Sequence, residues 1–167
     1  MRLALFLVTI TALLLAAALV GCKSQPAEVT PPAQTAAQAP KPDIDIPASL
    51  PEAKDAKVLV QAFYPLNEGH AEVVAAVRGL EGKFKGKVRT EIYDIRFPDE
   101  KPEDFKKWQA TGFAPCAGIM INDKHELMVD TGKGPETVLF EKAMGGMWTQ
   151  EQLEKAVADA VKATYKG

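Results

Sequence analysis

The chain has 167 residues, of which 47% are hydrophobic and 25% are charged, and its formal net charge is −2. This composition is typical of a soluble domain with an additional apolar stretch at one end. The charge is slightly negative and no long run of Lys or Arg occurs, which argues against a nucleic-acid-binding surface.

The apolar stretch is the N-terminus. Arg2 precedes an uncharged run over residues 3–20, which is typical of a signal-peptide core because a cleavage motif ends it. Leu19-Val20-Gly21-Cys22 matches the bacterial lipobox, in which small residues fit the signal peptidase and the cysteine thiol receives a diacylglyceryl group. We therefore expect residues 1–21 to be removed. The alternatives are a signal peptide without lipidation, or an uncleaved anchor.

Lipidation of Cys22 would hold the mature chain on a membrane, because several acyl chains such as palmitate give stable anchoring. The expected location is extracytoplasmic, at the cell membrane or the outer membrane. Lys23, in place of Asp after the lipidated residue, favours the outer membrane. Residues 22–51 contain seven of the twelve prolines and no hydrophobic period, which predicts a flexible linker.

Two strands with a helix between them are predicted next. Residues 58–63 form a short, mostly apolar run, the pattern of a strand buried on both faces of a sheet. Pro65 ends this run, and Asn67 is a preferred N-cap for the helix that follows. The helix carries one apolar stripe, formed by Val73, Val77, Leu80 and Phe84. Residues 88–95 are a second strand, and such a unit normally makes a right-handed parallel crossover.

A short helix is predicted over residues 103–111, where it would bury Phe105 and Trp108 and end at Gly112. Residues 127–130 and 137–144 are predicted as two strands on the antiparallel side of the same sheet.

The last helix is predicted to begin after Thr149. Gln152 lies three residues further on and completes a capping box.

Over residues 58–95 the chain resembles thioredoxin. The family's W-C-G-P-C motif falls on Leu66-Asn67-Glu68-Gly69-His70, so Asn67 and His70 stand where the family has its two thiols. Gln61 takes the place of the family's buried acid. The resemblance implies an α/β, thioredoxin-like three-layer fold over residues 52–167, with a mixed central sheet of about four to five strands flanked by helices. Without the thiols, dithiol exchange is not expected.

Residues 112–121 resemble the cis-proline loop of that family. In the family this loop lies against the start of the first helix. The resemblance therefore implies that Pro115 is cis and that a cleft is formed by Asn67, Glu68, His70, Ala114, Pro115 and Cys116. The favoured interpretation is a lipoprotein module that binds an extracytoplasmic protein or peptide in this cleft, with no cofactor and no metal.

Cys116 is the only cysteine of the expected domain, so a disulfide within the domain is excluded. It is either a small buried residue on a core strand or the nucleophile of a monothiol redox or peroxide-reducing site. In the second case His70 and the helix N-terminus would lower the pKa of the thiol. A further alternative is a weak soft-metal site formed by His70 and Cys116 with Met120 or Met147. His125 is expected to be solvated.

Overall fold

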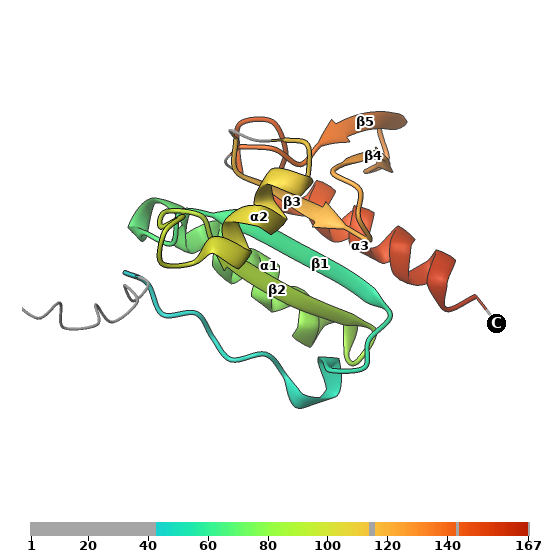
Figure 1. Ribbon diagram of the computed structural model, residues 1–167. Helices are drawn as coiled ribbons and strands as arrows, with labels where there is room; N and C mark the ends of the chain where they lie inside the picture. Colours follow the sequence, from blue (N-terminus) through green and yellow to red (C-terminus); the bar gives the residue numbers. More distant parts are fainter. Residues whose placement is uncertain (1–42, 114–115, 143, 167) are drawn as a thin grey trace, which may run out of the picture. The chain divides into compact units, whose positions relative to one another are not determined.

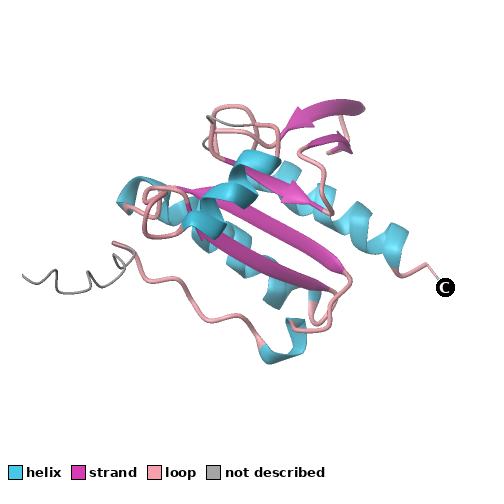
Figure 2. Ribbon diagram, viewed as in Figure 1, coloured by secondary structure: helices cyan, strands magenta, loops and turns pink. Residues whose placement is uncertain are grey.

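The computed structural model describes residues 43–113, 116–142 and 144–166 (Figure 1). The expected signal peptide, Cys22 and most of the expected linker lie outside the described residues. The described part is a mixed α/β domain with three α-helices and two β-sheets (Figure 2). No helix within these ranges is long and apolar enough to cross a membrane.

The larger sheet has three strands in the order β2-β1-β3. Its central strand β1 (Val58–Tyr64) is parallel to β2 (Val88–Asp94) and antiparallel to β3 (Gly118–Ile121). Helix α1 (Ala71–Phe84) connects β1 to β2, as the pattern predicts. Helix α2 (Pro102–Ala110) lies between β2 and β3 in the chain, and α3 (Gln150–Thr164) is the last element.

The two faces of this sheet are covered differently. Alternate residues of β1, from Val58 to Tyr64, point into the main core, where α1 and α3 cover them. Phe63 points to the other face and joins a smaller aromatic cluster beneath α2, whose buried members also include Tyr93, Trp108, Phe113 and Met120. The single short helix α2 leaves part of this second face to polar residues.

The last two strands form a separate sheet. Strands β4 (Glu126–Asp130) and β5 (Pro135–Leu139) pair only with each other, so the expectation of one sheet holding all strands was wrong. Only one residue in each strand is buried, Val129 in β4 and Val138 in β5, so this hairpin has a single small apolar face. After β5 the chain returns to β3, where Ile119 N–H donates to the carbonyl oxygen of Phe140 at 2.8 Å.

The starts of the helices agree only in part with the caps that the local sequence predicts. The capping box at α3 is confirmed, because Thr149 Oγ1 accepts from the backbone N–H of Gln152 and Gln152 Oε1 accepts from the backbone N–H of Thr149. The helix expected from Asn67 begins later: residues Glu68–His70 form the 3-10 turn η2, and α1 starts at Ala71.

The described chain begins with an extended segment, residues 43–56, which we call the strap. It includes the short 3-10 helix η1 (Pro51–Ala53). Ile44 and Ile46 pack against the main core, and Ala53 is fully buried. Residues 43–51, expected as part of the linker, therefore contact the domain. Figure 1 shows this segment running from the α1 start to the beginning of β1.

Candidate functional site

The start of α1 brings together Asn67 and His70, the two residues that the sequence comparison with thioredoxin singled out. Asn67 has extended backbone, and its side chain makes no hydrogen bond to the helix backbone. Instead, Asn67 Oδ1 lies 2.9 Å from His70 Nδ1. A 3-10 turn places residues i and i+3 above one another, which explains this pairing. The expectation that the Asn67 side chain caps the helix was therefore wrong.

Asp94 fixes the loop that leads into this turn. It is buried at the end of β2 and accepts from the backbone N–H of Leu66 at 3.4 Å and from Arg96 Nε at 3.0 Å. Burial raises the pKa of Asp94, but the hydrogen bonds from Arg96 and Leu66 outweigh it and hold the pKa below its usual range. The carboxylate therefore stays charged at neutral pH and holds Leu66 in place.

Tyr64 connects His70 with two later parts of the chain. Its ring centroid lies 5.4 Å from that of His70, and its buried hydroxyl donates to the carbonyl oxygen of Lys142 at 2.6 Å. Lys142 N–H in turn donates to the carbonyl oxygen of Ala117 at 2.6 Å. Burial raises the pKa of Tyr64, so the phenol remains a neutral donor. The end of β1, the segment after β5 and the chain just after Cys116 meet here.

Cys116 is half-buried and has no disulfide partner in the described chain. Its carbonyl oxygen accepts from Trp108 Nε1 at 2.9 Å, and its N–H donates to the carbonyl oxygen of Phe113 at 2.9 Å. The backbone of Cys116 is thus fixed by α2, and the thiol lies just before β3 rather than within a buried strand. Ala114 and Pro115, expected in the cleft, lie outside the described residues.

The expected pairing of His70 with Cys116 has no hydrogen bond to support it among the residues that the structure describes. Glu68 is exposed, whereas His70 is half-buried and bonded to Asn67.

The soft-metal alternative requires a methionine beside His70 and Cys116. Within residues 43–113, 116–142 and 144–166, no group of three His, Cys, Asp or Glu side chains is close enough to hold a metal ion. Met120 lies in the aromatic cluster, while Met147 is exposed. His125 is partly exposed; its Nε2 lies 3.4 Å from Glu141 Oε1, and its ring packs edge-on against Phe113.

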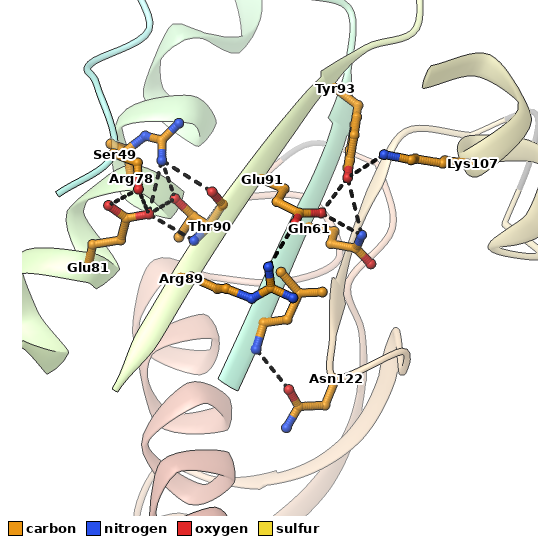
Figure 3. A network of polar contacts seen from close by, with 11 residues as sticks. Ser49, Gln61, Arg78, Glu81, Arg89, Thr90, Glu91, Tyr93, Lys107 and Asn122 are labelled. Carbon is orange, nitrogen blue, oxygen red and sulfur yellow. Dashed lines mark hydrogen bonds and ion pairs between the residues drawn. The ribbon is translucent and has the colours of Figure 1, made fainter. Parts of the chain in front are cut away.

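Two polar networks lie outside the expected cleft (Figure 3). On the α2 side of the sheet, Gln61 Nε2 donates to Glu91 Oε2 at 3.0 Å, and the hydroxyl of Tyr93 donates to the same carboxylate. Lys107 Nζ donates to Tyr93 Oη at 3.1 Å. Gln61 therefore hydrogen-bonds to Glu91 on the face of the sheet that α2 covers only in part.

The second network surrounds Glu81, which has no exposed surface. Sequence reasoning missed this residue, although a carboxylate one position after Leu80, on the apolar side of α1, was the available signal. Its oxygens accept from five groups of four residues: the hydroxyl of Ser49, the N–H of Leu50, the N–H and hydroxyl of Thr90, and Arg78 Nη1.

Comparisons of the chain with protein-family models, with curated proteins and with solved structures find no match to any of them. The functional argument therefore rests on the residues and contacts described above.

Proposed function

We propose that this chain is a lipid-anchored extracytoplasmic protein with a thioredoxin-like domain that binds a protein or peptide and does not exchange disulfides. The observation that carries the proposal is the pair at the start of α1. The two positions that match the family's thiols hold Asn67 and His70, and these side chains are bonded to each other at 2.9 Å.

The order and direction of the strands support the thioredoxin-like part of the proposal. The parallel β1-α1-β2 unit, the antiparallel β3 beside β1, and the pairing of Phe140 with β3 fit a 2-1-3 arrangement continued by a further extended segment. Fold alone does not assign an activity, so binding is inferred from the absent dithiol and the family's use of this end of the sheet.

The absence of dithiol chemistry is tested with the purified domain, residues 38–167, in an insulin-reduction assay. We expect no turnover above the rate of the reductant alone, because exchange needs an attacking and a resolving thiol. Turnover comparable to that of a dithiol thioredoxin would overturn the proposal.

Lipid anchoring is tested separately with Cys22→Ala in the full-length chain. Metabolic palmitate labelling should disappear and the protein should leave the membrane fraction. A Cys116→Ser variant serves as the matched control and should keep both the label and its location. Label that persists in Cys22→Ala would show that the lipobox interpretation is wrong.

Cys116 is only partly buried, and this favours one second candidate, a monothiol redox protein. Alkylation of the native domain with iodoacetamide at a series of pH values distinguishes a binding module from a monothiol redox protein. In a binding module Cys116 should react no faster than free N-acetylcysteine at each pH, whereas a redox thiol should react clearly faster at neutral pH.

A further inference from the structure

The strap determines which end of the domain is joined to the chain that precedes it. At its first described residue, Asp43 N–H donates to the carbonyl oxygen of Leu66 at 3.1 Å, and Asp43 Oδ2 lies 2.6 Å from Arg96 Nη1. Leu66 comes immediately before Asn67. The chain therefore enters the described domain beside the start of α1.

The other end of the strap lies at the opposite end of β1. Val58, the first residue of β1, donates its N–H to the carbonyl oxygen of Lys87 at 3.3 Å, just after the strap ends. Strand β1 has seven residues, so the two ends of the strap are separated along the strand by about 20 Å at ~3.3 Å per residue. A chain without the strap contacts would be attached at the Val58 end.

Contacts along its whole length keep the strap in place. Ser49 and Leu50 donate to the buried Glu81 carboxylate at 2.9 Å and 2.7 Å, which joins the strap to α1 and, through Thr90, to β2. Near η1, the carbonyl oxygen of Glu52 approaches Gly86 so closely that a Cβ there would lie 3.2 Å from it.

We propose that the strap keeps the start of α1, with Asn67 and His70, on average closer to the membrane that carries the lipid anchor than the opposite end of β1. This inference rests on the proposed function, because it requires the anchor at Cys22. Residues 22–42 can span at most roughly 70 Å, whereas a released strap would extend this limit to about 120 Å and attach the tether to the far end of the domain. The partner class that follows is a polypeptide presented at that same membrane surface.

The test uses the full lipoprotein in vesicles of phosphatidylethanolamine and phosphatidylglycerol, three to one, that contain an acceptor-labelled lipid. In a Cys116→Ser background, a donor dye is attached at Glu68→Cys, beside the α1 start, or at Lys87→Cys, beside the start of β1. Energy transfer to the bilayer should be higher from position 68 than from position 87.

A variant that releases the start of the strap, Asp43→Ala with Ile44→Ser, should reduce this difference, while Ser49 and Leu50 still hold the later part of the strap. Its matched control, Asp45→Ala with Ala48→Ser, changes two exposed strap residues and should keep the difference. Equal transfer from both positions in the unaltered strap would overturn the inference and leave the proposed function standing. Failure of every variant to bind vesicles would overturn the anchor and this inference together.

Discussion

Glu81 shows how a single buried charge joins three separate parts of this chain. Its carboxylate has no exposed surface, and it accepts hydrogen bonds from the strap, from β2 and from Arg78 on its own helix. A buried carboxylate is tolerated only when its lone pairs are satisfied, and here five groups satisfy them. Burial raises the pKa of Glu81, but the bonds from Thr90, Leu50 and Ser49 outweigh this and lower the pKa.

Removing this carboxylate should be costly. Glu81→Ala leaves Arg78 and several N–H groups without their acceptor, so the free energy of unfolding should fall by about 3–5 kcal/mol, as for other broken buried pairs. Glu81→Gln keeps one acceptor oxygen and should lose less. Urea unfolding at pH 7 measures both. Glu154→Gln, which changes a carboxylate paired with Lys83 at the surface, is the control and should change stability by less than about 1 kcal/mol.

The same residue predicts an acid-sensitive fold. The folded pKa of Glu81 lies below its unfolded value of about 4.3, so its contribution is complete above that pH and is lost as pH falls through the folded pKa. Asp94, whose pKa is also lowered, acts in the same direction. Unfolding free energy should therefore be steady between pH 7 and pH 5 and fall below about pH 4. In Glu81→Gln this fall should be smaller; an unchanged pH profile would show that the carboxylate contributes nothing.

At the scale of elements, local sequence signals predicted the helices and strands themselves better than the contacts that each of them makes. The capping box of Thr149 and Gln152 is a four-residue pattern, and it is present as expected. The pairing of β4 and β5 depends on which surface can cover one small apolar face, and this could not be predicted from the strands alone. The strap was missed for the same reason, because its partners, Glu81 and Leu66, are distant in sequence.

The capping box should contribute measurably to stability. Thr149→Ala removes the acceptor for the Gln152 N–H at the start of α3, and should lower the free energy of unfolding by about 1 kcal/mol. Thr164→Ala, in the last turn of the same helix, is the matched control and should be neutral or slightly stabilising, since Ala has the higher helix propensity. Thermal and urea unfolding followed by circular dichroism would compare them. Equal losses of unfolding free energy in the two variants would mean that the hydrogen bond from Gln152 to Thr149 does not stabilise the fold.

For the whole molecule, the question is whether the start of α1 is a thioredoxin-like cleft with its chemistry removed. The sequence predicted the two positions, and the structure brings Asn67 and His70 into contact. Ala114 and Pro115, which belong to the expected partner loop, lie outside the described residues. The contacts from Tyr64 through Lys142 to Ala117 do bring the chain after that loop toward this end of the sheet.

Introducing two thiols at these positions would test this directly. We expect Asn67→Cys/His70→Cys, in a Cys116→Ser background, to oxidise to an intramolecular disulfide, since side chains at positions 67 and 70 already meet at 2.9 Å. The control, Glu68→Cys/His70→Cys, places thiols two residues apart, where side chains do not face each other, and should stay reduced or form dimers. Mass spectrometry after alkylation distinguishes these states.

The same two variants then test whether the scaffold supports disulfide exchange once two thiols are present. If the introduced dithiol also reduces insulin while the wild-type domain does not, then two substitutions are enough for the start of α1 to support disulfide exchange. This is the outcome we expect, because Asp94 and Leu66 still hold the loop before position 67. A disulfide that closes but never reduces insulin would mean that the start of α1 lacks the facing loop a substrate needs, and the binding cleft would have to be sought elsewhere on the domain.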